Sequence, residues 1–451
     1  MSDPRDSSTL ATALLAHLRA SGPRSVIELC QALHISQPTF SRQVATLKAS
    51  VLTVGRARAT RYAALRSIGQ LPAALPIYEV LPDRTGRLGT LHPIHPRGFY
   101  VESDSPLVGF YPDFPWFLGD LRPAGFLGRL VPRQHPALGF PADIRLWSAD
   151  QVLVWIHDYG VDLVGDLIIG DPAFQRFLTM KPLNPVPSDA RRERYPILAA
   201  DALAAGDAGS SAGGEQPKFL ATRMDGETAT PVLVKFSPPV RDPVSRRLAD
   251  LLRCEHLALA AVARVGSPAA RSAIVEGGER VFLEVERFDR VSGTGRRGVV
   301  SLAALDDEFV GSRQSWTTTA DALLAQKRID RESHDRIQWL DRFGEWIGNT
   351  DRHHGNLSFF LERGRLGALA PIYDMLPMRY APRSGELVDT PLSLPALSGV
   401  RPDLWRSSWA AAVAFWTTVA QAELSQDFLV IARANADLVA SQEQVLDRLP
   451  G

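Results

Sequence analysis

A short polar stretch at residues 350–356, Thr-Asp-Arg-His-His-Gly-Asn, combines residue types that can act together in phosphoryl transfer. Asp351 and Asn356 are five residues apart, the interval at which protein kinases place a catalytic aspartate and a magnesium-binding asparagine. A loop that turns back on itself would bring both side chains to one side, where Asp351 can meet an acceptor hydroxyl. Taken alone, the stretch also fits a histidine-based metal nuclease or a structural turn.

Asp374, within Ile-Tyr-Asp-Met-Leu, lies eighteen residues after Asn356. That is the position expected of a second metal-binding aspartate, and hard oxygen ligands of this kind suit magnesium beside phosphates. A metal nuclease would need further ligands at matching spacing, and the sequence shows none. A structural turn would explain neither Asp374 nor the upstream features. The pattern therefore predicts phosphotransfer with ATP and Mg²⁺.

Upstream, a loop of small residues at 207–222 enters an expected strand, and its glycines allow backbone N–H groups to turn toward phosphate oxygens. Lys235 ends an apolar run in the next expected strand, from which kinase-like folds hold the nucleotide phosphates. A long expected helix carries Glu255, the candidate partner of that lysine. Each feature alone has a plainer interpretation: a flexible linker, an edge lysine and a solvated helix face. They occur along the chain in the same order as in protein kinases, which favours the catalytic interpretation.

Four motifs together resemble the HipA family of bacterial Ser/Thr kinases: Gly-Glu-Gln-Pro-Lys at 214–218, Val-Glu-Arg-Phe-Asp-Arg at 285–290, the 350–356 stretch and Tyr-Asp-Met at 373–375. The resemblance covers residues 75–440 approximately. Helical apolar spacing and a basic hairpin in residues 1–70 predict a helix-turn-helix, and its fusion to such a kinase resembles the YjjJ (HipH) subgroup. The resemblance implies an α+β, two-lobed protein-kinase-like fold and a toxin-like Ser/Thr protein kinase that uses ATP and Mg²⁺.

The resemblance also implies roles for individual residues. Asp351 would be the catalytic base, Asn356 and Asp374 would bind magnesium, and Lys235 would hold phosphates. The nucleotide would also contact residues of the Gly-rich loop, the hinge and the catalytic loop: Gly213, Gly214, Lys218, Glu286, Phe288 and His353. Relatives autophosphorylate a serine just before the Gly-rich motif. That position falls on Ser211 or its neighbour Ser210, where added charge would oppose nucleotide binding.

Two features depart from the family pattern. A DNA-binding segment in the same chain favours control in cis and makes a separate antitoxin less certain. Arg352 stands where the family pattern has a small residue. The resulting Asp-Arg-His resembles that of lipid-type kinases, so the acceptor class stays open. The implied partners are a protein substrate, such as a translation factor or an aminoacyl-tRNA synthetase, together with DNA and an antitoxin protein.

The first 70 residues hold nine Lys/Arg and three acids, a local net charge of +6 in a chain of zero net charge. Apolar spacing predicts helices at 8–22, 25–35 and 36–49, with Ser25 and Ser36 as N-caps of the last two. A basic hairpin follows, so we expect a winged helix-turn-helix whose third helix reads DNA. The candidate DNA contacts are polar residues of that helix and arginines of the hairpin: Gln37, Thr39, Ser41, Arg42, Arg56, Arg58 and Arg61. The alternative is a helical docking module with a solvated basic face.

The sequence predicts four parts: a winged helix-turn-helix at 1–70, a HipA-like N-terminal subdomain at 71–190, a kinase N-lobe at 191–290 and a helical C-lobe at 291–451. Residues 161–170 are expected to form a helix, and residues 182–196 a linker. Two distant cysteines, no signal-peptide pattern and no long apolar run predict a cytoplasmic protein without membrane attachment. Two rival functions stay open: a DNA-binding transcriptional regulator whose kinase-like body senses nucleotide or partner state, and a small-molecule kinase.

Overall fold

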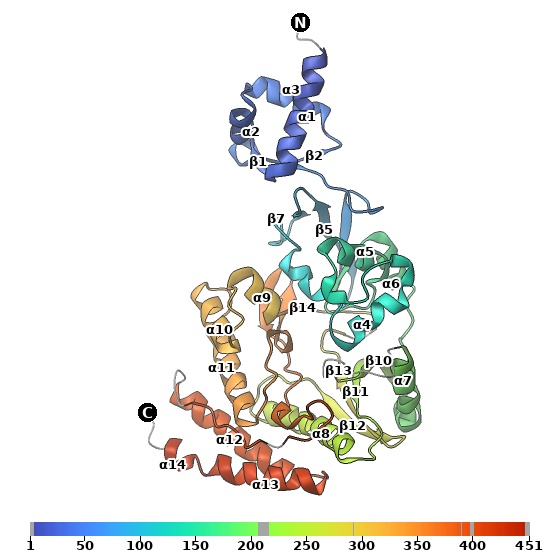
Figure 1. Cartoon of the computed structure of the whole chain (residues 1–451), viewed down its shortest axis with the longest axis vertical. Coiled ribbons are helices and arrows are strands. Elements are labelled where there is room, and N and C mark those ends of the chain that lie inside the picture. The colour runs from blue at the N-terminus through green and yellow to red at the C-terminus, as the bar shows by residue number, and fades with distance from the viewer. Residues whose placement is uncertain (1–3, 206–215, 292, 389, 397–400, 447–451) are drawn as a thin grey trace.

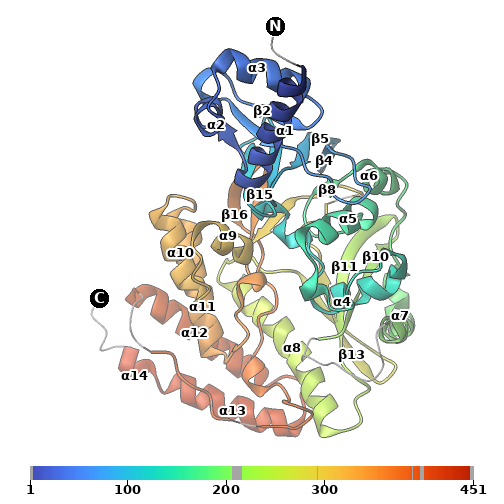
Figure 2. The same cartoon turned by 45° about the horizontal axis from the view of Figure 1, so that its top comes forward.

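The structure, a computed structural model, describes residues 4–205, 216–291, 293–388, 390–396 and 401–446. Figure 1 shows a group of N-terminal helices at one end of the molecule, a middle subdomain next to it, and two lobes beyond. The turned view in Figure 2 shows the same order along the molecule. No helix in these described ranges is both long and apolar enough to cross a membrane.

The N-terminal part packs helices against a small antiparallel sheet of strand order β1-β3-β2. Its elements are α1 (Pro4–Ser21), β1 (Arg24–Ser25), α2 (Val26–Leu33), α3 (Gln37–Thr46), β2 (Val51–Val54) and β3 (Arg61–Ala64). Ser25 and Glu28 exchange the reciprocal hydrogen bonds of a capping box at α2, and Ser36 caps α3. Leu29 and Phe40 lie in the shared core. This is the element order of a winged helix-turn-helix.

A glycine permits the tight hairpin between β2 and β3. Gly55 has a φ of 86°, and a Cβ at this position would lie 2.8 Å from the carbonyl oxygen of Ala59. The loop continues through a short 3-10 turn, η1 (Ala57–Ala59), and the side chains of Arg56 and Arg58 are exposed. The basic hairpin expected from the sequence is therefore present.

The middle subdomain is built on an antiparallel sheet of order β7-β6-β5-β4-β8. Its elements are β4 (Leu75–Val80), β5 (Thr85–Pro93), β6 (Phe99–Ser103), β7 (Gly109–Tyr111), η2 (Trp116–Leu121), α4 (Gly125–Gln134), η3 (Pro136–Leu138), η4 (Ile144–Leu146), α5 (Ala149–Tyr159), β8 (Leu167–Ile169) and α6 (Asp171–Leu178). The predicted helix at 161–170 is wrong, because β8 pairs with β4 and the flanking Gly165 and Gly170 have positive φ values. By periodicity, a short apolar run fits a buried strand as well as a helix.

The N-lobe carries a sheet of order β12-β13-β11-β10-β9. Its elements are β9 (Pro185–Pro187), η5 (Ser188–Ala190), α7 (Arg191–Ala205), β10 (Lys218–Asp225), β11 (Thr228–Phe236), α8 (Pro243–Arg264), β12 (Ser272–Gly277) and β13 (Arg280–Glu286). The predicted linker at 182–196 is wrong, because β9 pairs in parallel with β10 and α7 begins within this range. The Asn184 side chain anchors this edge by donating to the carbonyl of Leu220 at 3.0 Å.

The C-lobe is mainly helical and includes a small antiparallel sheet of order β14-β15-β16. Its elements are β14 (Gly298–Ser301), α9 (Leu302–Phe309), α10 (Trp316–Ala325), α11 (Arg331–Trp346), η6 (His354–Asn356), β15 (Ser358–Glu362), β16 (Arg365–Leu369), η7 (Met378–Tyr380), α12 (Pro402–Val419), α13 (Gln426–Ala440) and α14 (Glu443–Leu446). The hairpin of β15 and β16 directly follows the 350–356 stretch. The sheet-based N-lobe and helical C-lobe give the α+β, two-lobed, kinase-like architecture.

A continuous apolar core joins the middle subdomain to the C-lobe. Leu153 of α5 and Trp346 of α11 belong to the same buried cluster. The N-terminal part attaches through a β-bridge to Ile94 of the middle subdomain and through an ion pair between Arg66 and Asp150. The apolar core thus joins the middle subdomain to the C-lobe, and the bridge and ion pair join the N-terminal part to the middle subdomain.

Candidate active site

Lys235 projects from β11 into a buried cluster with two carboxylates. Its Nζ lies 2.6 Å and 2.8 Å from the two carboxylate oxygens of Glu255 on α8, and it also contacts Asp374. Lys235 and Glu255 are 6% and 1% exposed. Burial acts to lower the pKa of Lys235, but Asp374 and Glu255 outweigh it and raise that pKa. The lysine therefore stays charged, and the lysine–glutamate pair expected from the sequence is present.

Asp374 reaches the same cluster from the chain that follows β16. Its φ of 55° lies in the left-handed region, and its backbone N–H donates to Oε1 of Glu255 at 3.2 Å. Burial acts to raise the pKa of the Asp374 carboxyl, but Lys235 and then Lys218 outweigh it and lower that pKa. The carboxylate is thus held ionised, which is the state that binds a metal ion.

Asp351 and Asn356 lie on one loop between α11 and β15, closed by the turn η6. The Asn356 Nδ2 donates to the carbonyl of Asp351 at 2.9 Å, and the Asp351 N–H donates to Oδ1 of Asn349 at 3.0 Å. Asn356 is 3% exposed, whereas Asp351 is an exposed residue. The Asn356 amide oxygen has no hydrogen-bond partner in the described part of the chain. These bonds use neither that oxygen nor the Asp351 carboxylate, as the predicted metal ligand and the predicted base require.

Arg352 directs its guanidinium into α11. Its Nε donates to Oδ1 of Asp341 at 2.8 Å, and other guanidinium nitrogens contact the carbonyl of Asn349 and, at 3.4 Å, Glu345. Gly344 makes room for this side chain, because a Cβ there would lie 2.6 Å from the Arg352 Cδ. The arginine that departs from the family pattern thus supports the loop that carries Asp351.

Tyr373 connects the segments that carry the two candidate metal ligands. Its hydroxyl donates to the carbonyl of Gly355 at 2.7 Å and lies 3.1 Å from the hydroxyl of Ser358. Burial raises the pKa of Tyr373, so the phenol stays protonated and can donate. Because Gly355 precedes Asn356 and Tyr373 precedes Asp374, this bond holds the segments of the two candidate ligands at a fixed spacing. The sequence motif contained the tyrosine but gave it no role.

The two histidines of the loop have different surroundings. His353 is exposed, its Nδ1 accepts the N–H of Gly355 at 3.1 Å, and it is close enough to influence the pKa of Asp374. His354 is buried, and its Nε2 lies 2.9 Å from the hydroxyl of Thr319. His353 therefore lies on the side of the candidate metal ligands, while His354 ties the loop to α10.

The predicted hinge follows β13. The Glu286 N–H donates to the carbonyl of Arg271 at 2.9 Å, so this donor is already used. Phe288 follows in a turn, and its N–H has no hydrogen-bond partner among the residues described. Its ring packs against Tyr373, with centroids 5.7 Å apart. Of the two predicted hinge residues, Phe288 is the one whose backbone N–H can meet an adenine.

The donor set of Asn356 and Asp374 fits a magnesium ion held jointly by protein and phosphate oxygens. Magnesium in phosphotransferases takes one or two protein carboxylates and completes its octahedron with water and substrate. Across the described ranges, no group of three or more His, Cys, Asp and Glu side chains is placed to hold a metal. The histidine-based nuclease site considered above therefore finds no support in these residues.

Part of the predicted site lies outside the described residues. Four predicted residues fall within 206–215: Gly213, Gly214, Ser210 and Ser211. The described chain resumes just before β10, where Lys218 stands opposite Lys235 in the strand pairing. Because Lys218 also lowers the pKa of Asp374, its charge reaches the same cluster. The structure thus brings Lys218, Lys235 and His353 around Asp374.

The predicted DNA contacts lie on α3 and the hairpin, and they differ in exposure. Five of them are exposed and form no ion pair within the described part of the chain: Gln37, Ser41, Arg42, Arg56 and Arg58. Thr39 is half-buried, and its hydroxyl bonds to that of Ser36 at 2.9 Å. Arg61 donates to Glu28 at 2.8 Å, so its charge is partly balanced within the protein. The arginines best placed to meet a polyanion are therefore Arg42, Arg56 and Arg58.

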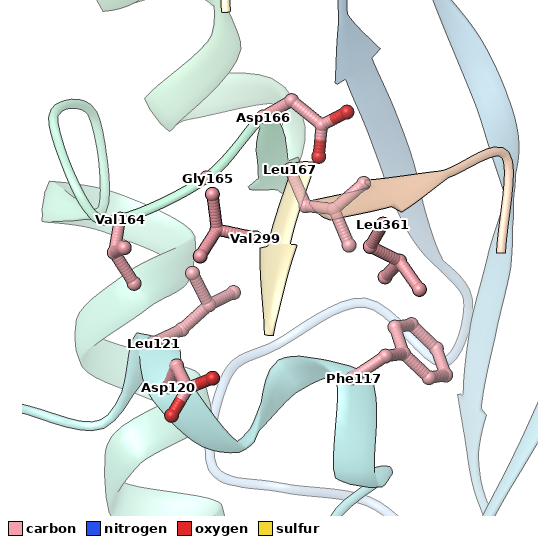
Figure 3. Close-up of a pocket in the computed structure, with 9 residues that line it drawn as sticks. All are labelled: Phe117, Asp120, Leu121, Val164, Gly165, Asp166, Leu167, Val299 and Leu361. Atoms are coloured by element: carbon pink, nitrogen blue, oxygen red, sulfur yellow. The ribbon is translucent and has the colours of Figure 1, made fainter. Parts of the chain in front are cut away.

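A small cavity between the middle subdomain and the C-lobe is lined by none of the candidate catalytic residues. Asp120 and Asp166 lie at opposite ends of its lining, with Val299 between them (Figure 3). Its volume of about 10 Å³ is room for a single water molecule, far too little for a nucleotide. Asp120 accepts hydrogen bonds of 2.6 Å from both the N–H and the hydroxyl of Ser301, and so reinforces the start of α9.

Comparisons with known proteins agree with the motifs. The family described as "YjjJ-like toxin, middle domain" matches residues 71–178, and the "HipA-like C-terminal domain" matches residues 210–439. Toxin YjjJ of Escherichia coli (strain K12) is 38% identical over 445 residues, which cover 97% of this chain and 99% of that protein.

Solved structures that align with this chain include a HipA complex and a bacterial kinase. The HipA complex of Shewanella oneidensis MR-1 with HipB and its operator DNA aligns with a TM-score of 0.49 and 15% identity over 83% of this chain and 100% of that chain. The proinflammatory kinase CtkA of Helicobacter pylori aligns with a TM-score of 0.35 and 13% identity over 49% of this chain and 90% of that chain. On the family matches and the near-full-length identity, the chain belongs to the YjjJ-like toxins, with a HipA-like C-terminal domain.

Proposed function

We propose that this chain is an ATP- and Mg²⁺-dependent Ser/Thr protein kinase of HipA type. The observation that carries the proposal is the buried cluster of Lys235, Glu255 and Asp374, to which the loop of Asp351 and Asn356 is tied through Tyr373. Protein kinases require a strand lysine paired with a helix glutamate, and a metal-binding aspartate next to them. Membership of the HipA-like toxins supports the same activity.

In the proposed reaction, Lys235 leaves its contact with Asp374 to bind the α- and β-phosphates of ATP, while Glu255 holds its position. Asp351 accepts the proton of a serine or threonine hydroxyl as that oxygen bonds to the γ-phosphorus. The bond from the γ-phosphorus to the β,γ-bridging oxygen breaks, and ADP leaves. Asn356 and Asp374 would hold a magnesium ion, which would neutralise the charge on the phosphates.

The exposed carboxylate of Asp351 supports a protein acceptor, since a large chain can approach it from solvent. The guanidinium of Arg352 is engaged by Asp341, so it does not supply a cation for a lipid or sugar acceptor. The resemblance to HipA kinases implies a substrate in translation, such as a translation factor or an aminoacyl-tRNA synthetase. A small-molecule kinase would instead show ATP turnover stimulated by a metabolite and no phosphoprotein product.

Overexpression tests this activity against a purely regulatory role. Asp351→Ala removes the proposed base and should abolish growth inhibition, whereas Glu332→Gln, an exposed change on α11, should leave it intact. Both variants should bind DNA like the wild type, because the N-terminal part is unchanged. Growth inhibition that survives Asp351→Ala would favour a DNA-binding regulator whose kinase-like body senses nucleotide or partner state.

Autophosphorylation at Ser211 or Ser210 belongs to the same proposal. These serines lie outside the described residues, and the resemblance to HipA kinases is what assigns them. A phosphate there would repel the nucleotide phosphates and inhibit the kinase. Peptide mapping of ATP-treated protein tests this directly, and no phosphate at either serine would refute it.

DNA binding is a second proposed function, carried by the exposed Arg42, Arg56 and Arg58 on a winged helix-turn-helix arrangement. A positive segment on a neutral chain is suited to a polyanion. Binding of the full chain to its own promoter DNA tests this function, and a separate antitoxin would be sought by co-purification. If the chain bound neither promoter DNA nor random duplex, the docking-module alternative would be favoured.

A further inference from the structure

The hinge motif at 285–290 is held by an acid that comes from the middle subdomain. Asp162 lies between α5 and β8, and its Oδ1 accepts from Nη1 of Arg287 at 3.0 Å and from Nη2 of Arg290 at 2.7 Å. The carbonyl of Leu163 accepts from Arg287 at 3.3 Å. Residues about 125 positions apart in the chain are thus joined through one carboxylate.

A second carboxylate, within the motif, completes the network. Asp289 accepts from Arg287 at 3.0 Å and from Arg290 at 2.7 Å, and also from the N–H of Gly165 at 3.0 Å. Burial acts to raise the pKa of Asp289, but the two arginines outweigh it and lower that pKa to about 2. The side chains of Arg287 and Arg290 are 12% and 6% exposed, so solvent screens these contacts little.

The network fixes the residue that faces the proposed adenine position. Phe288 lies between Arg287 and Asp289, both of which are held against the middle subdomain. Its ring also packs against Tyr373 and Phe360, with centroid distances of 5.7 Å and 6.2 Å. The Phe288 N–H, unpaired among the described residues, is therefore set at a fixed place relative to Asp374.

Buried ion networks contribute little net stability compared with well-packed apolar groups, but they can specify one geometry. Here the specified geometry is that of the hinge. The catalytic cluster around Lys235 has separate supports in Glu255 and Tyr373. A change in the network should therefore weaken binding of the adenine base more than binding of the phosphates.

We propose that Asp162 is a positioning residue for the nucleotide base: through Arg287 and Arg290 it sets the Phe288 backbone for adenine recognition. The inference rests on the proposed kinase function and extends the ATP site to the middle subdomain. Asp162 itself does not touch the nucleotide in this account. It acts on the affinity for ATP and not on phosphoryl transfer.

The test compares ATP with inorganic tripolyphosphate, which carries the phosphates without the adenosine. Both are titrated with Mg²⁺ into the full-length wild type, Asp162→Asn, Asp162→Glu and the control Asp150→Asn, which alters another ion pair of the same subdomain. Asp162→Asn should bind ATP weaker by about tenfold while its tripolyphosphate affinity is unchanged. Asp162→Glu should restore part of the ATP affinity, and Asp150→Asn should match the wild type. At saturating ATP, kcat of Asp162→Asn should stay close to that of the wild type.

Unchanged ATP affinity in Asp162→Asn would overturn the inference while leaving the kinase proposal intact. An equal loss for ATP and tripolyphosphate would also overturn it, because general loosening would explain both. A wild type that binds neither ligand would refute the kinase proposal itself. If Asp162→Asn folds poorly by thermal unfolding, Arg287→Lys, which keeps the charge but not the forked contacts, is measured with the same expected difference between ligands.

Discussion

Lys235 and Glu255 form a buried ion pair in which one ammonium nitrogen lies 2.6 Å and 2.8 Å from both oxygens of one carboxylate. The same nitrogen contacts Asp374, so a single cation is shared by a helix of the N-lobe and by the C-lobe segment that carries the proposed metal ligand Asp374. This shared contact aligns the two lobes around the proposed phosphate site. It also indicates which substitutions should affect catalysis.

Glu255→Gln should reduce phosphoryl transfer by about 10²-fold, because the neutral amide no longer holds Lys235 in the position that binds phosphates. The matched control is Glu276→Gln, which weakens the exposed pair with Arg253 on the same lobe and should leave the rate unchanged. Steady-state phosphorylation of the protein itself or of a generic substrate measures the effect. Equal rates for the wild type and Glu255→Gln would show that the pair has no part in catalysis.

Arg352→Lys should lower kcat by about tenfold with little change in KM for the acceptor, since lysine keeps the charge but cannot reproduce the forked contacts to Asp341 and the Asn349 carbonyl. Arg336→Lys, on α11, the helix that carries Asp341, is the matched control. A rise in acceptor KM without a fall in kcat would instead mean that Arg352 meets the acceptor, as in the lipid-type interpretation.

Asp166→Asn should become more stable relative to the wild type as the pH rises. Burial, and then the charge of Glu79, raise the pKa of Asp166 from 3.8 to about 7. The folded state therefore binds this proton more tightly than the unfolded state. The free energy of unfolding of the wild type should fall, by up to about 1.4 kcal/mol per pH unit, between these two pKa values and level off above the higher one.

Thermal unfolding of Asp166→Asn and the wild type near pH 5 and pH 8 measures this effect, because these pH values lie on either side of about 7. The exposed Asp104→Asn on the same subdomain is the control and should show no such trend. A Tm difference that is the same at both pH values would mean that Asp166 is ionised throughout, paired with a group that offsets its burial.

Arg58→Ala should weaken DNA binding and reduce the slope of log K against log salt by about one unit, as expected for one lost phosphate contact. Arg61→Ala should have a smaller effect, because its guanidinium already pairs with Glu28. Salt titrations of both variants with the same duplex give the comparison. Equal effects for Arg58 and Arg61, or none for either, would place the DNA contacts elsewhere.

Local signals in the sequence were sufficient to predict much of the fold and the order of the kinase-like motifs along the chain. Ser25 and Ser36, as N-caps, predicted the starts of α2 and α3 correctly, because helix caps depend on near neighbours. The strand lysine and helix glutamate were paired correctly, because kinase-like folds require this contact whatever their sequence. The roles of Asp351, Asn356 and Asp374 stay predictions that activity measurements must test.

The errors and omissions concern contacts between distant segments. The run at 167–169 was predicted as part of a helix, since an apolar run does not reveal that it pairs with the distant strand β4. The linker prediction at 182–196 failed for a similar reason, because β9 forms only against β10. Asp162 gave no local signal at all, since its partner Arg287 lies 125 residues later in the chain.

The most direct test of the kinase proposal is the intact mass of purified, initially unphosphorylated protein before and after incubation with ATP and Mg²⁺, in the wild type and in Asp351→Ala. The account predicts a gain of one phosphoryl group in the wild type, mapped to Ser211 or Ser210, and no gain in Asp351→Ala. No gain in the wild type would contradict the autokinase activity and make the DNA target the primary question. A gain in both proteins would contradict the role assigned to Asp351.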